Sequence, residues 1–282
     1  MEKFTFINSN EESINFSEDY PYILQTFEGI GGVKTAIQKQ KSINQDGESY
    51  LDNYLEPRYI TLQITLVAKN TAEMSSIRSR LLKVLNPKLG LGILRYEVGN
   101  NIKELKALAE FAPDFFPEEE FRDTRQKAFL SLYCPNPYWQ DISISSEEMV
   151  TWIGGMTFPL SLPTEFAMAG EKIINIINSG DVETPITLEI SGTATNPKVM
   201  NTLTGEYIKV NRTLDVGDTL IITTEFANKR VEQNGINVFN YIDLGSTFFS
   251  LNAGDNILEL TTDDINDNAT IKISYRNRYL GV

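Results

Sequence analysis

The sequence predicts a mainly β protein of two sandwich domains, the first of which carries a single helix. Arg58 to Lys69 alternates apolar and polar side chains with the period of two of a half-buried strand. Only Thr71 to Leu85 shows a convincing helical period. After Trp139, short apolar runs separated by Gly, Asn and Asp are typical of a sandwich or jelly roll. The chain length suits two domains, which we place at residues 1–140 and 141–282.

The composition excludes several classes of function. With no histidine and one cysteine, the chain lacks the commonest general base, every Ser-His or Cys-His pair, and any zinc site of several thiolates. No apolar run approaches the ~18 residues that suggest a membrane span, and no signal peptide is readable. We therefore expect no cofactor, no metal ion, no catalytic residue and no membrane association.

The charge is unevenly distributed along the chain. The net charge is −13, of which residues 1–140 carry −3 (16 Lys and Arg, 19 Asp and Glu) and residues 141–282 carry −10 (9 and 19). An acidic chain without a basic stripe is not a conventional nucleic-acid binder. We therefore expect no sequence-specific contact with nucleic acid.

The first half begins with short strands around Phe4–Phe6 and Tyr20–Phe27. The glycine cluster that follows, Gly29-Ile30-Gly31-Gly32, is interpreted as a turn or bulge, because a phosphate loop would need Lys-Ser/Thr after it. The polar stretch Lys34–Tyr54, with a turn at Asp46-Gly47, predicts a long hairpin arm that protrudes from the fold.

The helix has clear boundaries in the sequence. Asn70 is a suitable N-cap, with Glu73 three residues later, and Asn86-Pro87 ends the helix. Its apolar stripe is interpreted as core packing. Ile93–Val98 predicts another strand, whereas Ile102–Phe111 fits either a helix or a strand.

Phe129 to Cys134 predicts the last strand of the first domain. Apolar or aromatic side chains occur at both odd and even positions of this segment, so we expect both faces of the strand to be covered. Pro135 and Pro137 end it. Tyr138 and Trp139 follow directly, and we expect them to pack where the two domains meet. Cys134 is interpreted as a strand residue rather than a nucleophile, because no histidine could activate it.

Eight short strands are predicted in the second half. They are Ile142–Ile144, Ile173–Ile177, Ile186–Ile190, Tyr207–Val210, Leu220–Thr224, Ile236–Tyr241, Ile257–Leu260 and Thr270–Tyr275. Asn234-Gly235 is the best hairpin turn. The acidic segment Asp263–Asp267 could hold calcium, but its carboxylates lack a bidentate partner at a defined spacing.

Several residues recur in an order that carries a family resemblance. In the first half they are Gly29, Gly31, Gly32, Asp46, Gly47, Arg58, Asn86, Pro87, Asn136, Pro137, Tyr138 and Trp139. In the second half they are Asn178, Gly180, Asn196, Pro197 and Gly205. This ordered set resembles the distal tail protein family of long-tailed, siphovirus-type bacteriophages, over nearly the whole chain.

The resemblance implies a structural protein of the virion, made in the host cytoplasm and located at the phage tail tip. The first domain would assemble head-to-tail into a hexamer ring, which could also stack, below the tail tube protein and above the tail-tip protein. The second, galectin-like domain would lie at the periphery of the ring, where receptor-binding or tip fibre proteins attach. Weak binding of cell-surface carbohydrate is compatible with such a domain.

Two other functions remain open from the residues alone. One is a carbohydrate-binding accessory module at a cell surface, because the second half is rich in aromatic side chains that could stack on sugars. These are Trp152, Phe158, Phe166, Tyr207, Phe226, Phe239, Tyr241, Phe248 and Phe249. The other is a glycosidase with two carboxylates, for which no pairing is recognisable.

Overall fold

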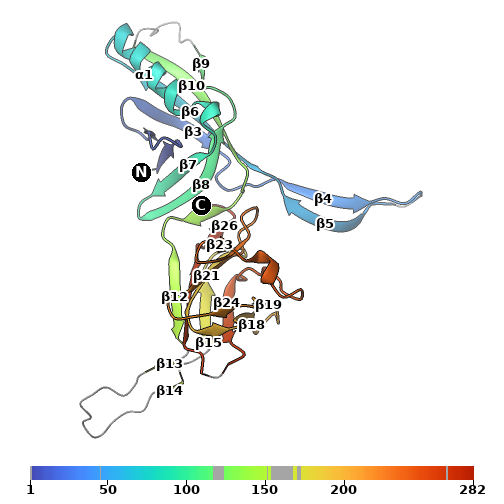
Figure 1. Cartoon of the computed structure of the whole chain (residues 1–282). Helices are drawn as coiled ribbons and strands as arrows, with labels where there is room; N and C mark the ends of the chain where they lie inside the picture. The colour runs from blue at the N-terminus through green and yellow to red at the C-terminus, as the bar shows by residue number, and fades with distance from the viewer. Residues whose placement is uncertain are drawn as a thin grey trace, which may run out of the picture. The chain divides into compact units, whose positions relative to one another are not determined.

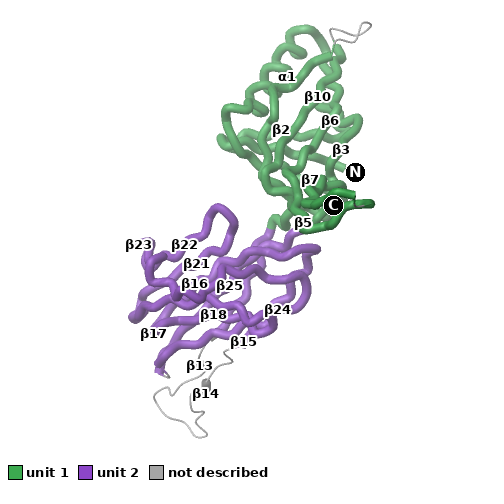
Figure 2. The backbone as a smooth tube through the Cα atoms, turned by 90° about the vertical axis from the view of Figure 1, so that its right-hand side faces the viewer, with its two compact units in different colours: residues 1–142, 279–282 green, residues 143–278 purple. Residues whose placement is uncertain are grey.

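The chain divides into two compact units. The computed structural model describes residues 2–44, 46–116, 124–150, 152–153, 168–169, 173–264 and 266–282. Unit 1 comprises Met1–Ile142 and Tyr279–Val282, and unit 2 comprises Ser143–Arg278 (Figure 2). The last four residues therefore belong to unit 1, although they were predicted to lie in the second domain. Phe158, Phe166 and the side chain of Trp152 lie outside the described residues.

Unit 1 is built on one continuous sheet that encloses its own core. Its strands follow the order β2-β1-β7-β8-β10-β6-β3. They span Glu2–Ile7 (β1), Ser13–Phe16 (β2), Tyr22–Glu28 (β3), Arg58–Val67 (β6), Gly92–Val98 (β7), Asn101–Ala109 (β8) and Arg125–Cys134 (β10). The short strands β9 (Asp114–Phe116) and β11 (Trp139–Asp141) pair with β10 and β8. The two layers of the predicted sandwich are thus parts of one sheet.

Helix α1 (Thr71–Val84) packs its predicted apolar stripe into this core. Its N-cap is Asn70, whose side chain accepts a hydrogen bond from the Glu73 amide at 2.9 Å. The Glu73 carboxylate returns to the Lys69 amide at 2.7 Å, and a 3₁₀ turn, η1 (Pro87–Leu89), follows the helix. The predicted helix is therefore confirmed.

The structure settles two expectations about the strands of unit 1. Most of the ambiguous segment Ile102–Phe111 lies in β8, which pairs with β7 up to Ala107 and with β10 at Leu108 and Ala109. The expectation that both faces of the β10 strand are covered is met in part. One face is buried, and on the other Ser131 is buried while Phe129 and Tyr133 are partly buried. They contact other aromatic side chains there, since Phe129 stacks on Phe111.

A separate two-stranded ribbon projects from unit 1 (Figure 1). It consists of β4 (Thr35–Gln40) and β5 (Ser49–Leu55), which pair antiparallel from Thr35–Leu55 to Gln40–Ser49. We refer to residues 34–56 as the arm. The predicted protruding hairpin is therefore present.

Unit 2 is a sandwich of two antiparallel sheets, with orders β12-β25-β16-β21-β22-β23 and β15-β24-β18-β19. The first contains Ser145–Val150 (β12), Ile186–Gly192 (β16), Thr219–Thr223 (β21), Arg230–Gln233 (β22), Ile236–Asn237 (β23) and Ala269–Tyr275 (β25). The second contains Ile173–Asn178 (β15), Lys198–Asn201 (β18), Tyr207–Lys209 (β19) and Gly254–Thr261 (β24). Short pairs are formed by β13 (Trp152–Ile153) with β14 (Met168–Ala169) and by β17 (Ala194–Thr195) with β20 (Thr213–Leu214). The last strand, β26 (Arg278–Tyr279), belongs instead to the sheet of unit 1, where it pairs with β11.

Two predicted strands of the second half are wrong. Ile142–Ile144 is irregular, because the chain passes there from unit 1 to unit 2, and β12 begins only at Ser145. The predicted strand Ile236–Tyr241 stops at Asn237, whose side chain accepts a hydrogen bond from the Phe239 amide at 2.9 Å. That bond turns the chain into the 3₁₀ turn η2 (Phe239–Tyr241).

Candidate functional site

A buried arginine holds the base of the arm. Arg58 opens β6 and is 2% exposed. Its guanidinium donates hydrogen bonds to three backbone carbonyls, those of Pro137 (2.8 Å from Nε), Gly29 (2.5 Å from Nη1) and Leu280 (from Nη2). Burial lowers the pKa of Arg58, and the three carbonyl dipoles offset the desolvation of its charge. Segments from both ends of unit 1 are thereby joined to the strand that follows the arm.

The glycine cluster fits closely around the start of β6. Gly29 has φ +92°, and a Cβ atom there would lie 2.0 Å from the carbonyl oxygen of Tyr59. Only glycine fits this position. The Trp139 indole donates a hydrogen bond to the Ile30 carbonyl at 3.0 Å, and a Cβ on Gly281 would lie 3.1 Å from Gly31. The turn predicted at the glycine cluster is therefore a packing site for three distant segments.

The position of Trp139 differs from the expectation that it packs where the two domains meet. Its side chain is fully buried in the core of unit 1, where its ring centroid lies 6.0 Å from that of Tyr96. Its indole N–H requires a hydrogen-bond acceptor when buried, and Ile30 supplies it. Trp139 therefore belongs to the core of the first unit, and Tyr138 beside it is half-buried. Asn136 shapes this turn by accepting a hydrogen bond from the Tyr138 amide at 3.2 Å.

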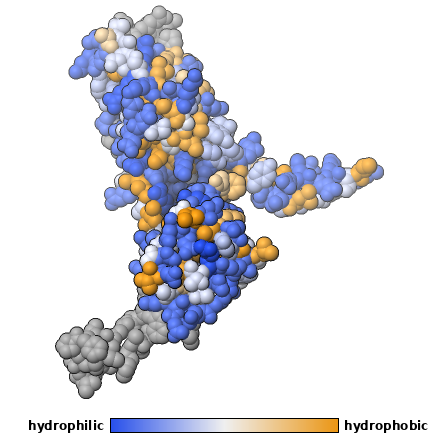
Figure 3. All heavy atoms as spheres, viewed as in Figure 1, coloured by the Kyte–Doolittle hydropathy of each residue, from blue (hydrophilic) through white to orange (hydrophobic). Residues whose placement is uncertain are grey.

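The arm itself exposes an unusual amount of apolar surface. The exposed fractions are 60% for Ile37, 95% for Ile43, 63% for Tyr50, 58% for Leu51 and 58% for Tyr54. Figure 3 shows hydrophobic residues at its tip and along its length. An isolated two-stranded hairpin is marginally stable in water, and large exposed apolar patches mark interaction sites. The arm is therefore the strongest candidate interface in unit 1.

Two ion pairs hold the strands of the arm together. Lys34 and Glu56 pair at its base at 3.0 Å, and Lys39 and Glu48 pair near its tip at 2.5 Å. Both pairs are partly exposed, so each stabilises the ribbon only weakly. The turn predicted at Asp46 and Gly47 lies in the exposed tip, where Gly47 has φ +76°.

Sequence reasoning missed the role of the last four residues of the chain. The Tyr279 hydroxyl contacts the Asp141 carboxylate at 3.2 Å, and the Lys103 ammonium lies 3.5 Å from the Tyr279 ring centroid. Burial alone would lower the pKa of Lys103, but its 2.5 Å hydrogen bond to Asp141 and its interactions with Tyr279 together outweigh burial and raise that pKa. The aromatic and apolar character of Tyr279–Val282 was the available signal that this tail packs on a core.

The other residues of the predicted set make local contacts. Asn86 accepts a hydrogen bond from the Lys88 amide at 3.0 Å, and Pro87 begins η1. Asn178 is buried and donates to the carbonyls of Val182 (2.9 Å) and Leu251 (3.1 Å). Turn-forming roles are seen for four further residues, Gly180, Asn196, Pro197 and Gly205. Of the whole set, the structure brings Gly29, Arg58, Pro137 and Trp139 into one cluster, to which Gly31 is joined by Gly281.

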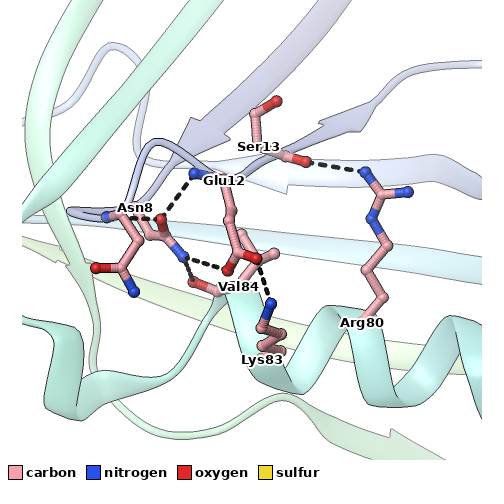
Figure 4. Close-up of polar contacts among 7 residues, drawn as sticks. Asn8, Glu12, Ser13, Arg80, Lys83 and Val84 are labelled. Atoms are coloured by element: carbon pink, nitrogen blue, oxygen red, sulfur yellow. Dashed lines mark hydrogen bonds and ion pairs between the residues drawn. The ribbon is translucent and has the colours of Figure 1, made fainter.

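A groove of about 510 Å³ lies between α1 and the β1–β2 turn. Lys83 pairs there with Glu12, and Arg80 reaches the Ser13 carbonyl at 3.4 Å (Figure 4). Asn8 orders the turn, because its side chain accepts a hydrogen bond from the Glu12 amide at 3.0 Å and donates one to the Val84 carbonyl at 3.4 Å. The hydrogen bond from Lys83 is the main cause that lowers the pKa of Glu12. These charges satisfy one another and join the turn to the helix.

The described residues contain neither a candidate metal site nor a membrane-spanning helix. There, no group of three or more His, Cys, Asp or Glu residues could hold a metal ion. The Asp263 carboxylate is engaged by Asn196 (2.8 Å) and Lys209 (3.3 Å), and Asp267 accepts the Thr195 amide at 2.6 Å. In the same part of the chain, no helix is long and apolar enough to cross a membrane.

Both units match family models of phage tail proteins. Residues 9–134 match the phage tail protein RIFT-related domain, and residues 179–279 match the C-terminal domain of the siphovirus-type tail component. The chain belongs to the siphovirus-type distal tail protein family. A search of curated proteins gave no match.

Solved structures show the same fold. The crystal structure of the Dit protein of phage SPP1, described as a paradigm of the hub adsorption apparatus in phages that infect Gram-positive bacteria, matches with a TM-score of 0.71 at 13% identity, covering 98% of both chains. The baseplate of phage P2, in its activated conformation with calcium, contains a chain that matches with a TM-score of 0.53 at 11% identity, covering 100% of both chains.

Proposed function

We propose that this chain is the structural hub protein at the distal end of a phage tail, where six copies form a ring that joins the tail tube to the tail tip. The observation that carries the proposal is the arm, whose apolar side chains are exposed in the single chain. Family membership and the folds of the SPP1 hub protein and the P2 baseplate support it. In this role the chain is a virion component without catalytic activity.

A head-to-tail ring explains why the arm is exposed in one chain. In a heterologous ring, each subunit uses one surface to contact the next and a different surface to receive the previous one. An arm of one subunit would then be covered by its neighbour, which removes its apolar side chains from water. The Arg58 cluster supports this by fixing the chain on both sides of the arm.

Charge and neighbouring proteins fit the same role. The first half has a net charge of only −3, which suits a surface largely buried between subunits. Without a basic stripe, the ring would not hold the phosphates of DNA passing through it. The tail tube protein would bind on one side of the ring and the tail-tip protein on the other. Unit 2 would offer attachment to receptor-binding or tip fibre proteins.

Light scattering after size-exclusion chromatography tests the ring. We expect a species of about six times the 31.8 kDa of one chain, alone or after the tail tube protein is added. The double variant Ile37→Asp/Tyr54→Asp should stay monomeric with an unchanged circular dichroism spectrum, because both side chains are exposed in the single chain. A native chain that stays monomeric with the tube protein present would overturn the proposal.

A further inference from the structure

One side of unit 2 carries an ordered and largely exposed group of apolar side chains. The segment 239–249 crosses from one sheet of the sandwich to the other. Just before this segment, the Val238 amide donates a hydrogen bond to the Val231 carbonyl of β22 at 2.9 Å. Near its end, the Thr247 amide donates one to the Tyr207 carbonyl of β19 at 2.8 Å. Phe239 and Tyr241 on this crossing are 44% and 40% exposed.

Two tight turns on this side each present one large apolar residue to solvent. Phe226 is 87% exposed, in a turn closed by the Asn228 amide donating to the Glu225 carbonyl at 3.0 Å. Ala227 beside it has φ +59°, a conformation that side-chain-bearing residues rarely adopt. Leu244 is fully exposed, in a turn where Asp243 accepts the Ser246 amide at 3.0 Å. Strained or hydrogen-bonded turns that hold apolar side chains in water are typical of binding surfaces.

Two cations lie against aromatic rings of the crossing segment, and one of them, Lys229, follows the Phe226 turn. The Lys229 ammonium lies 5.3 Å from the ring centroid of Phe248, which itself stacks on Phe239 at 5.6 Å. The Arg212 guanidinium lies 4.6 Å from the Tyr241 ring centroid. We define the loop surface as Phe226, Lys229, Phe239, Tyr241, Leu244 and Phe248, with Arg212 at its edge.

The loop surface is poorly suited to carbohydrate. A sugar platform requires an open aromatic ring face on which the sugar can stack. Here Lys229 and Phe239 cover Phe248, and Arg212 covers Tyr241, so that Phe226, which is 87% exposed, is a single ring rather than part of a platform. Leu244, the most exposed side chain of the group, has no ring at all. Protruding apolar anchors with a charged edge instead fit the pockets of a partner protein.

The charge of the loop surface indicates the kind of partner. Lys229 pairs with no carboxylate within the described part of the chain, whereas the neighbouring Arg230 pairs with Glu232 at 3.7 Å. Arg212 is already engaged, because its Nε donates a hydrogen bond to Gln233 at 3.1 Å. The unpaired ammonium of Lys229, in a half-chain of net charge −10, is complementary to an acidic partner surface. We infer that the loop surface binds another protein of the tail tip, inserting Phe226 and Leu244 into apolar pockets with an acidic rim. The tail-tip origin of that partner rests on the proposed function.

Binding measurements with the full chain test this inference. The tail-tip, receptor-binding and tip fibre proteins of the same virion would each be purified and titrated onto the immobilised chain by biolayer interferometry. One of them should bind, and Phe226→Asp and Leu244→Asp should each weaken that binding by about tenfold or more. Lys229→Glu should weaken it and reduce its salt dependence.

The matched control is Val216→Asp. Val216 is 88% exposed, almost the same as Phe226, but its turn precedes Thr219 at the end of the β21–β22 pair opposite Phe226. This variant should bind as the native chain does. The inference is overturned if none of these proteins binds, if the anchor variants bind unchanged, or if Val216→Asp weakens binding equally.

Two further measurements separate this inference from its rivals. Purified cell-wall polysaccharide is titrated in parallel, and binding that is lost only in Phe226→Asp would assign the loop surface to carbohydrate and overturn the inference. Light scattering of each variant reports the ring. Loss of partner binding with an intact ring supports the loop surface as the attachment site. An absent ring with intact partner binding would refute the hub proposal alone.

Discussion

Arg58 and Leu280 lie 222 residues apart in the sequence and share a hydrogen bond from guanidinium to carbonyl. The same guanidinium bonds to Gly29 and Pro137, so four segments of unit 1 meet at one side chain. A planar fork of five donors suits this task, because a lysine could not reach three carbonyls in fixed directions. The arm emerges between two of these segments, so the geometry of its base depends on Arg58.

Replacing Arg58 with methionine should destabilise unit 1 strongly. The change leaves three carbonyls without their donor in a buried site, and we expect the free energy of unfolding to fall by about 3–5 kcal/mol. Urea unfolding followed by tryptophan fluorescence in a Trp152→Phe background, where Trp139 beside this cluster is the one reporter, measures the loss. Arg80→Met is the control, because Arg80 is exposed and its hydrogen bond to the Ser13 carbonyl is long, at 3.4 Å. A loss no larger than that of the control would show that Arg58 does not hold the cluster.

Deleting Tyr279–Val282 should destabilise unit 1 and spare unit 2. The deletion removes an acceptor from Arg58, the Tyr279 ring beneath Lys103 and the packing of Val282 on the core of unit 1. Hydrogen exchange read by mass spectrometry resolves the two units. Amides of β1, β6 and β10 should exchange faster, while those of β16 and β25 keep their protection. Equal acceleration in both units, or in neither, would contradict the assignment of this tail to unit 1.

The sequence predicts those elements whose signals are local. The helix follows from Asn70, its apolar stripe and Asn86-Pro87, all within one segment. The arm follows from a long polar run between a glycine cluster and an alternating strand. The strand at 101–109 could not be assigned, because its apolar residues fit both periods and only its pairing with β7 decides.

The family resemblance identified the residues of the cluster at the base of the arm, but it did not predict that they lie together. Gly29, Arg58, Pro137 and Trp139 are far apart in the chain, and no periodicity indicates that they meet. The expectation for Trp139 failed for a related reason. A large aromatic after a strand can pack outward or inward, and the acceptor that draws it inward, Ile30, is remote in sequence.

Gly29→Ala should cost far more stability than Gly47→Ala. Both glycines have positive φ, which an alanine tolerates at a cost of about 1–2 kcal/mol. At Gly47 an added Cβ meets open space, whereas at Gly29 it would lie 2.0 Å from a backbone oxygen. We therefore expect about 1 kcal/mol for Gly47→Ala and at least about 3 kcal/mol for Gly29→Ala. Urea unfolding of the two variants compares them directly, and equal losses would show that the close contact with Tyr59 relaxes without cost.

Cys134 should make the stability of the chain fall at alkaline pH. Burial raises the pKa of its thiol to about 12, although the nearby Arg58 charge opposes the shift. The unfolded thiol ionises near pH ~8.5, so above that pH the unfolded state loses a proton that the folded state keeps. The contribution of Cys134 is thus fully present below pH ~8.5 and is lost as the pH rises toward about 12.

Urea unfolding of the native chain and of Cys134→Ala is measured from neutral to alkaline pH. The difference between them isolates the contribution of Cys134 to the free energy of unfolding, because all other titrating groups are common to both. The native chain should lose more stability above pH ~8.5 than the variant does. A thiol reagent adds a kinetic check, since the folded chain should react with it only as fast as unit 1 opens. Parallel stability curves for the two chains, together with rapid labelling of the folded thiol, would mean that Cys134 is accessible and its pKa unshifted.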